Sequence, residues 1–261
     1  MKGHALDYPA MAPDQGRLIA IDAIDGAGKD TIAKELCSAL EGRGRKVCNL
    51  DTIIKNAKSP YFPLGDSEFF EKYDAIYVSE PTHGGIGLTI REEIMKKEST
   101  YNALATAWAY AIDRHVLYER TVLPFLRAKP NRLVLQGRGL MSSLTYQTIQ
   151  SEEEGRPLSV ADLLAIPGNR LELSRPPDLI ILLVCSVEVA QRRLAGRTDA
   201  PVTDKFSDPR FQAKVSLRYR SPEVIGTFER LGSRVVYIDA ERSVPDVSAD
   251  CLHALNALIP A

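Results

Sequence analysis

A glycine-rich turn directly after an apolar run is the feature of this chain that most constrains its fold. Residues 18–31 read Leu-Ile-Ala-Ile-Asp-Ala-Ile-Asp-Gly-Ala-Gly-Lys-Asp-Thr, and a helical pattern follows. Gly26 and Gly28 permit backbone conformations that a Cβ would block, so successive N–H groups can converge on a phosphate at the helix N-terminus. Lys29 adds a mobile positive charge. The order of strand, turn and helix therefore predicts an α/β fold that holds the phosphate of a ligand.

The turn departs from the common phosphate-loop pattern G-x-x-x-x-G-K-[ST] at two positions. Ala23 stands at the first glycine, and Asp30 stands where a hydroxyl would bind Mg²⁺. Because a carboxylate is also a hard oxygen ligand, one interpretation makes Asp30 a Mg²⁺ ligand. The other makes it only a favourable charge at the positive end of the helix. For the whole segment, an ordinary glycine-rich strand-to-helix turn is the alternative.

Length and composition limit what else the chain can do. With 261 residues it can bury a full core, and we expect one domain over 17–261 after a flexible N-terminal tail, 1–16. A net charge of −1 favours small-molecule ligands over nucleic acid or an anionic membrane. The cysteines and histidines show no disulfide or metal spacing, and the sequence contains neither the apolar core of a signal peptide nor a bilayer-spanning run. These features predict a cytoplasmic protein.

Short apolar runs alternate with longer helical patterns along the chain, which is typical of βαβ units. We therefore predict a three-layer α/β/α fold of the P-loop type with a mainly parallel sheet of about five strands. The candidate strands are 17–23, 46–50, 75–79, 132–136, 178–184 and 234–238. The candidate helices are 30–41, 86–96, 101–126, 140–150, 187–194, 209–230 and 247–258, with Ser99 or Thr100 as the cap of the third. Loops are predicted at 51–71 and 155–177.

Two groups of polar residues fall where ligands bind in such a sheet, beyond the carboxyl ends of the strands. Glu80 directly follows a candidate strand, and Arg91 lies on the next helix. Arg138 follows another strand, and its planar fork suits a monophosphate. Ser143 and Tyr146 then share one side of the helix after it. For the first group, a capped helix with exposed charges is the alternative interpretation.

The long central helix carries a second candidate pair. Tyr110 and Arg114 lie four residues apart and so share a face. A flat ring can stack on a base while a guanidinium donates to its carbonyl oxygen. The alternative is a solvated or cation–π pair on a helix whose apolar stripe, Trp108, Ile112 and Val116, faces the core.

Three arginines follow the fifth candidate strand: Arg192, Arg193 and Arg197. Arg193 and Arg197 lie four residues apart, and Gly196 frees the chain near its end. One interpretation is a solvated helix end. The other is an Arg-rich lid, 192–208, whose guanidinium groups neutralise a transferring phosphoryl group.

Taken in this order, the segments resemble the thymidylate kinases of the P-loop nucleoside monophosphate kinase group, from about Leu18 to Ala240. Members of that family typically read E-G-x-D-G-x-G-K-S-T, then R-E-P-[TG], then an aromatic-x-x-x-Arg on the long helix. D-R-Y-x-x-S-S-x-A-Y-Q, P-D-L before a core strand and an Arg-rich lid follow. The corresponding segments here are 22–31, 79–82, Tyr110 with Arg114, 137–147, 177–179 and 192–205.

The resemblance implies a homodimeric kinase that uses ATP and Mg²⁺ to convert dTMP to dTDP. It implies a donor site over Asp25, Gly26, Ala27, Gly28, Lys29, Asp30 and Thr31. The implied acceptor site comprises Asp25, Glu80, Arg91, Tyr110, Arg114, Arg138, Ser143 and Tyr146. Lys29, Arg138, Arg193 and Arg197 are implied to act on the transferring phosphoryl group, and Asp30 on the metal.

The chain departs from this family pattern beyond its phosphate loop as well. Ser79 replaces the Arg before Glu-Pro, and Gly137 and Gly139 replace the acidic and aromatic neighbours of Arg138. About 24 additional residues at 51–74 have no counterpart in the pattern. These departures leave two alternatives open: a related kinase for another deoxynucleotide or a nucleoside, and a nucleotide-binding protein that has lost catalysis.

Overall fold

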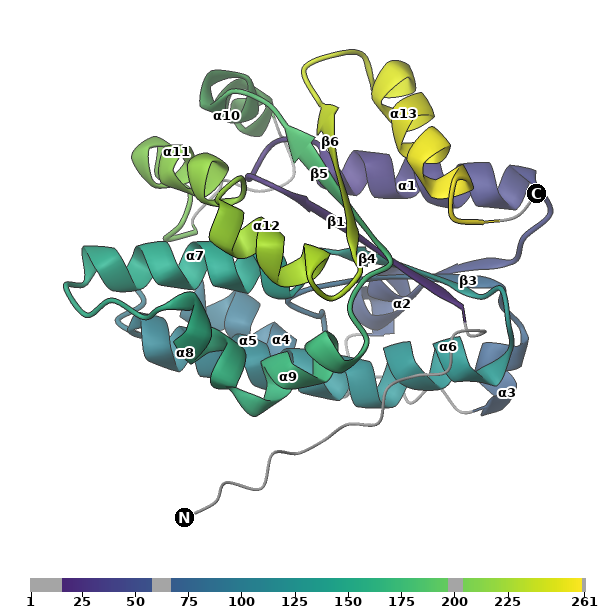
Figure 1. Ribbon diagram of the computed structural model, residues 1–261, viewed down its shortest axis with the longest axis horizontal. Coiled ribbons are helices and arrows are strands. Elements are labelled where there is room, and N and C mark those ends of the chain that lie inside the picture. The colour runs from purple at the N-terminus through teal and green to yellow at the C-terminus, as the bar shows by residue number, and fades with distance from the viewer. Residues whose placement is uncertain (1–15, 58–66, 197–203, 260–261) are drawn as a thin grey trace.

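A six-stranded sheet forms the centre of the protein (Figure 1). The computed structural model describes residues 16–57, 67–196 and 204–259. The strand order is β2-β3-β4-β1-β5-β6, and every neighbouring pair is parallel. The strands are β1 Arg17–Ala23, β2 Val47–Asn49, β3 Ala75–Ser79, β4 Leu133–Gly137, β5 Leu179–Val184 and β6 Arg234–Asp239. The predicted parallel sheet is confirmed; it has six strands rather than about five, and each of the six candidate segments supplies one.

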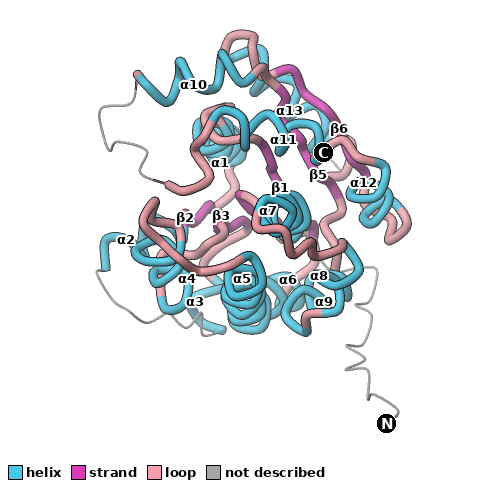
Figure 2. The backbone as a smooth tube through the Cα atoms, turned by 90° about the vertical axis from the view of Figure 1, so that its left-hand side faces the viewer, coloured by secondary structure: helices cyan, strands magenta, loops and turns pink. Residues whose placement is uncertain are grey.

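Helices cover both faces of this sheet, as the three-layer prediction requires. In Figure 1, α1 and α13 lie on one face and α5, α6, α7 and α9 on the other, and Figure 2 shows the same separation from the side. Their bounds are α1 Lys29–Gly42, α2 Leu50–Ala57, α3 Ser67–Glu71, α4 Gly85–Thr89, α5 Ala103–Leu117, α6 Leu123–Ala128, α7 Leu140–Glu153, α8 Val160–Ala165, α9 Pro167–Ser174, α10 Val187–Ala195, α11 Pro209–Arg218, α12 Pro222–Glu229 and α13 Val244–Asn256. π-Helical turns follow α4 at Ile90–Ile94 and α5 at Tyr118–Val122.

The predicted helix at 209–230 is two helices. Pro222 lacks the N–H that would continue the first helix, and it stands at the first position of α12. The Ser221 side chain caps α12 by accepting from Val224 N. The predicted cap of the long helix is also wrong, because Asn102 caps α5 and accepts from Ala105 N.

The predicted loops at 51–71 and 155–177 both contain helices. The first holds most of α2 and all of α3, and the second holds α8 and α9. A capping box opens α8, in which Ser159 and Asp162 satisfy each other's backbone N–H groups. One proline of the second predicted loop, Pro167, stands at the beginning of α9.

The expected apolar stripe of α5 does not face the core. Trp108 and Ile112 are each 46 % exposed. The buried side of α5 carries small residues such as Ala107 and Ala111. They allow α9 to pack closely, since a Cβ added at Gly168 would lie 1.9 Å from the Ala111 carbonyl oxygen. Because α5 and α9 pack closely, the small side chains of α5 face the interior and its largest apolar side chains do not.

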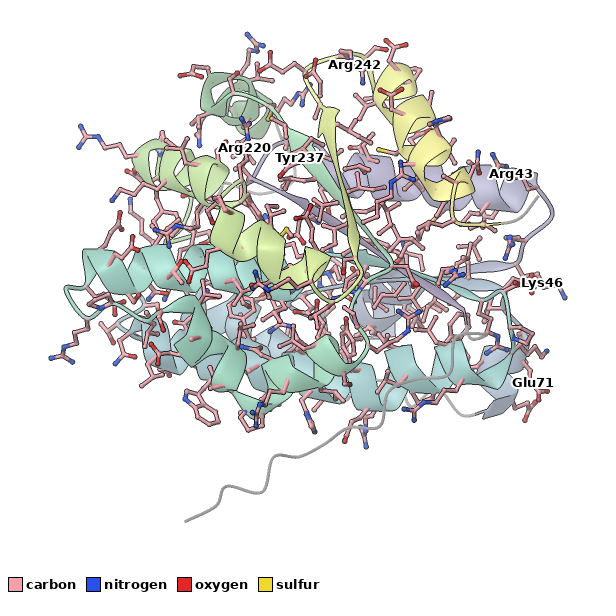
Figure 3. The ribbon with its side chains drawn as sticks, viewed as in Figure 1. Arg43, Lys46, Glu71, Arg220, Tyr237 and Arg242 are labelled. Carbon is pink, nitrogen blue, oxygen red and sulfur yellow. The ribbon has the colours of Figure 1, made fainter. Side chains whose placement is uncertain are left out.

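The core forms on both faces of the sheet because side chains alternate along each strand. On β1, Leu18 packs in a cluster with residues of α5 and α6, whereas Ile19 and Ile21 join the larger cluster that includes α1. Arg43 at the end of α1 donates to Asn256 at the end of α13, 2.6 Å away, and Figure 3 labels Arg43 at this position. All four cysteines are buried and unpaired. Within the described ranges, no helix is both long and apolar enough to cross a membrane.

Candidate nucleotide site

The phosphate loop joins β1 to α1, and its two glycines adopt left-handed backbone conformations. Gly26 has φ 86° and Gly28, which precedes the first residue of α1, has φ 98°. A Cβ added at Gly26 would lie 2.3 Å from the Ala190 carbonyl oxygen. Position 26 therefore requires glycine for two reasons, its φ and the close approach of α10.

Lys29 opens α1 inside a broad cleft of about 490 Å³. Its ammonium contacts the carboxylate of Asp30, and its side chain is 13 % exposed against 58 % for Asp30. Asp25, Gly26 and Gly28 line the same cleft. The predicted donor residues are thus largely brought together, although Ala27 and Thr31 do not line the cleft.

Arg193, one of the predicted lid arginines, contacts the phosphate loop itself. Arg193 Nη1 donates to the Ala27 carbonyl oxygen at 3.2 Å, and its Nη2 donates to the Ala240 carbonyl oxygen at 2.8 Å. In this conformation Arg193 braces the phosphate loop from α10. Residues 197–203 of the predicted lid, Arg197 among them, lie outside the described residues.

A second, smaller cavity of about 50 Å³ adjoins the cleft. Tyr110, Arg114, Ser143 and Tyr146 line it, as predicted for the acceptor site. The two hollows share a wall made of Asp25, Glu80, Pro81, Met95, Arg138 and Asp204. A group held in the cavity therefore meets a group held on the phosphate loop at Asp25 and Arg138.

Asp25 and Arg138 form an ion pair at this junction. Asp25 Oδ2 also accepts from Tyr146 Oη at 3.3 Å and from Gln212 Nε2 at 2.8 Å. Arg138 adopts φ 66°, a left-handed conformation that costs a residue with a Cβ about 1–3 kcal/mol. The surrounding contacts hold the backbone there, since Arg138 N donates to the Ile21 carbonyl oxygen at 2.9 Å.

A buried carboxyl group supports the junction from behind. Asp22 Oδ1 accepts from Ser142 Oγ at 2.5 Å and from Tyr219 Oη at 3.2 Å. Ser142 and Tyr219 in turn contact Arg138 Nη1 at 3.1 and 3.3 Å. Burial raises the pKa of Asp22, although the hydrogen bond from Ser142 and the charge of Arg138 oppose this shift. Asp22 is therefore a positioning group for Arg138.

Arg114 is fully buried at the floor of the cavity. Its Nη2 donates to Glu80 Oε2 at 2.5 Å and to Ser143 Oγ at 3.0 Å. Its Nε lies 2.9 Å from Glu172 Oε2, and its Nη1 donates to Asn169 Oδ1. Burial raises the pKa of both Glu80 and Glu172, while the shared guanidinium opposes the shift. The face of Arg114 predicted to read a base is thus already engaged with two carboxyl groups.

Glu172 occupies space that the family pattern gives to an aromatic residue. A Cβ added at Gly139 would lie 3.1 Å from Glu172 Oε1 and 2.9 Å from Gln136 Nε2. Gln136 Nε2 also donates to Glu80 Oε1 at 3.0 Å. The absent side chain at Gly139 therefore makes room for a polar cluster around Arg114.

Arg91 lies over the end of β3, where the family pattern has an additional arginine. Its Nε donates to the Thr82 carbonyl oxygen at 3.1 Å, and its Nη2 donates to the Pro81 carbonyl oxygen. The same Nη2 is 3.5 Å from Ser79 Oγ. Arg91 lines the cleft, so it brings a positive charge close to the position that Ser79 leaves neutral.

Gly137 is sterically closed to the acid of the family pattern. A Cβ added there would lie 2.5 Å from Tyr77 Oη and 3.3 Å from Ser79 Cβ.

We expect Gly137→Ala to lower the free energy of unfolding by about 1–3 kcal/mol through overpacking. Tyr77→Phe removes the hydroxyl, so the double variant should regain most of this loss in a denaturant titration. Gly42→Ala, whose added Cβ meets no described atom within 4 Å, is the control. Equal losses in the single and double variants would contradict the steric explanation.

Asp204 gives the site a pH-dependent contribution to stability. Burial raises its pKa to about 6, although its hydrogen bond from Phe206 N, 2.8 Å long, opposes the shift. Because the pKa is raised on folding, the contribution is fully present below about pH 4 and is lost as the pH rises through about 6. We expect the stability of Asp204→Asn relative to wild type to increase by about 1–3 kcal/mol between pH 4 and pH 8. Denaturant titrations at several pH values measure it, and a constant difference would contradict it.

Sequence reasoning missed several polar residues of the site. Glu172, Asn169 and Gln212 come from helices α9 and α11 and carried no motif. Asp51 carried a usable signal, because it follows the 46–50 candidate strand as Glu80 follows its own strand. The loop predicted at 51–71 includes it, whereas the structure has Asp51 in the first turn of α2.

These features define a class of protein: a parallel α/β fold with a phosphate loop after β1 and a second ligand cavity at the strand carboxyl ends, as in P-loop kinases. The thymidylate kinase family profile matches residues 70–251, which is more than half of the chain. The chain therefore belongs to the thymidylate kinase family. The matched range begins after the phosphate loop, whose assignment rests on its own geometry.

Curated relatives agree with this family assignment. The chain is 28 % identical over 209 residues to a probable thymidylate kinase of Pyrococcus abyssi, covering 78 % of this chain and 82 % of the relative. It is 26 % identical over 242 residues to a probable thymidylate kinase of Thermococcus gammatolerans, covering 90 % and 93 %. The thymidylate kinase of Rhodopirellula baltica is 22 % identical over 240 residues, covering 92 % and 80 %.

Proposed function

We propose that the protein transfers the γ-phosphoryl group of ATP to the phosphate of dTMP, giving ADP and dTDP. Family membership supports the reaction, and the shared wall of the two hollows is the observation that carries it. A donor on the phosphate loop and an acceptor in the cavity meet at Asp25 and Arg138. A protein that only bound one nucleotide would not need a second cavity at that point.

Each side of the junction has its own task. Lys29 and the N–H groups of the phosphate loop hold the donor phosphates, and the ammonium neutralises charge on the transferring group. Arg138 grips the acceptor phosphate, and Arg91 adds charge beside it. Arg193 supports the phosphate loop, and Arg197 closes over the donor. In such a site, positioning and charge neutralisation provide most of the rate.

The acceptor cavity binds the nucleoside part. Tyr110 stacks on the base, and Tyr146 lies against the sugar. Asp25, beside Tyr146, accepts a hydrogen bond from the sugar hydroxyl. Ser143 and Arg114 face the base edge. The cavity is far smaller than the roughly 300 Å³ of a typical small-molecule pocket. Binding therefore requires side chains at the shared wall to move apart.

We propose Mg²⁺ as the companion of ATP, and the donor atoms fit such an ion. The carboxylate of Asp30 lines the cleft beside Lys29 and offers a hard oxygen ligand. Among the described residues no three His, Cys, Asp or Glu side chains form a metal site by themselves, which agrees with an ion held largely by phosphates and water. When bound, Mg²⁺ neutralises phosphate charge.

Asp30→Ala tests this assignment. We expect the Mg²⁺ concentration for half-maximal activity to rise about tenfold, which corresponds to roughly 1.4 kcal/mol. If Asp30 only complements the helix end, the melting temperature falls slightly and the Mg²⁺ titration stays unchanged.

We further propose a cytoplasmic protein that acts as a homodimer on nucleotides and binds no nucleic acid. These statements rest on the family and on the net charge of −1. The domain over 17–261, with the insertion 51–74 and the lid 192–208, is proposed on the same basis.

A panel of acceptors tests the function. ADP release, coupled to NADH oxidation, is measured with dTMP, dUMP, dCMP, dAMP, dGMP and thymidine. We expect dTMP to give the highest kcat/KM and thymidine to give no turnover. A preference for thymidine would identify a nucleoside kinase. Equal ADP release with and without acceptors would identify a protein without transferase activity.

A further inference from the structure

Helix α2, which belongs to the insertion, brings a carboxylate to the carboxyl end of β3. Asp51 in its first turn accepts from Ser79 N at 3.0 Å and from Ser79 Oγ. Ser79 is the register partner of Gly137 on the neighbouring strand β4. The carboxylate therefore stands one strand away from the position where the family pattern has its acid.

That family position is filled differently in this chain. Tyr77 Oη occupies the space where a side chain at Gly137 would begin. Tyr77, Asp51, Asp30 and Lys29 all line the same cleft. The position that lacks the family acid, Gly137, thus lies close to the added helix α2. This helix supplies a carboxylate, Asp51, from a different part of the chain.

The Asp51 carboxylate is largely buried, and the positive charges of Arg91 and Lys29 act on it only from a distance. Its side chain is only 14 % exposed. Among the described side chains no lysine or arginine lies within ion-pair distance of it, and His83 Nε2 is 4.0 Å from Oδ2. A cation in the cleft would compensate the carboxylate.

We propose that Asp51 faces the Mg²⁺ ion of the bound nucleotide and replaces the acid that Gly137 lacks. This inference rests on the proposed function, because the ion arrives with ATP. It also assigns a purpose to the first part of the insertion: α2 holds a metal-facing carboxylate in the cleft that Asp30 also lines. Mg²⁺ in nucleotide sites takes one or two protein carboxylates and retains water, which suits two aspartates that line one cleft.

The competing explanation is that Asp51 only fastens α2 to β3. Asp51→Asn separates the two, because asparagine keeps an acceptor for Ser79 N–H and a donor for Ser79 Oγ but removes the charge. Asp74→Asn is the matched control. Asp74 stands just before the opposite end of β3 and accepts from Lys46 N at 2.9 Å, away from the cleft.

Mn²⁺ serves as the probe. Its affinity for the complex of the full chain with a non-hydrolysable ATP analogue is measured by electron paramagnetic resonance. Binding of the metal-free analogue is measured by calorimetry in EDTA. We expect Asp51→Asn to weaken Mn²⁺ binding about tenfold or more. Metal-free analogue should bind as well as before or more tightly, because a charge that repels phosphate is gone. Asp74→Asn should change neither value.

Unchanged Mn²⁺ affinity in Asp51→Asn would overturn the proposal and leave the kinase function standing. Failure of the wild-type chain to bind the analogue with Mn²⁺ would overturn both. Should Asp51→Asn not fold, Asp51→Ser takes its place, since a hydroxyl also accepts hydrogen bonds. Ser79→Ala provides the reverse comparison: it removes a fastening contact but keeps the charge. We expect it to retain Mn²⁺ affinity, and a loss equal to that of Asp51→Asn would favour the fastening role.

Discussion

Replacing Lys29 by methionine is expected to lower kcat about a thousandfold or more in a protein that remains folded. The ammonium lies at the start of α1, inside the cleft that the phosphate loop lines. Removal of a charge that acts mainly on the transition state lowers kcat and kcat/KM by similar factors. Methionine keeps the apolar stem, and Asp30, which loses its contact with the ammonium, is largely exposed, so stability should change little. Steady-state kinetics and thermal melting measure the two effects.

Lys34→Met is the matched control for this variant. Lys34 lies on the same helix, is exposed and lines the same cleft, but it is five residues beyond the phosphate loop lysine. We expect its kcat to remain within about threefold of wild type, because exposed charges are screened by solvent. Near-normal turnover in a folded Lys29→Met protein, or equal losses in both variants, would contradict the kinase assignment.

Replacing Arg114 by leucine is expected to destabilise the protein by about 3–5 kcal/mol. Because Arg114 lines the acceptor cavity, its loss should also raise the KM for dTMP more than that for ATP. The structure adds a larger consequence, because Arg114 is the buried counter-ion of both Glu80 and Glu172. Removing it leaves two buried carboxyl groups without compensation. Denaturant titration measures the loss.

A double variant distinguishes this explanation from simple loss of packing. Arg114→Leu with Glu172→Gln removes one of the uncompensated carboxyl groups. We expect the double variant to lose clearly less stability than the two single variants added together. Additive losses would argue against the shared ion pair. Wild-type stability in Arg114→Leu, with only the acceptor KM raised, would show that Arg114 serves the base rather than the fold.

Most of the sheet could be predicted because strand signals are local. The apolar runs that became β1 and β3 have the predicted bounds, and the other strands differ by one residue at either end. Helix positions follow from the same alternation. Boundaries were harder, since proline marks both loops and helix starts. At α8 and α12, the capping hydrogen bonds of Ser159 and Ser221 show that a helix begins there rather than a loop.

The site was predictable where chemistry follows a strand directly. Glu80 and Arg138 come immediately after β3 and β4, and Lys29 ends the phosphate loop that follows β1, so topology alone brings them together. Glu172 and Gln212 were not predictable, because their place depends on how α9 and α11 pack. The burial of Arg114 likewise depends on Gly139, whose missing side chain admits Glu172. Orientation of Trp108 depended on helix packing rather than on hydrophobicity.

Direct observation of the product tests the central assignment most sharply. The purified chain is incubated with ATP, Mg²⁺ and dTMP, and the phosphorus nuclear magnetic resonance spectrum is followed with time. We expect the dTMP signal to decline as the paired signals of dTDP and ADP grow in equal amounts. Persistence of the dTMP signal while ATP is converted to ADP and inorganic phosphate, or while ATP is unchanged, would contradict phosphoryl transfer to dTMP.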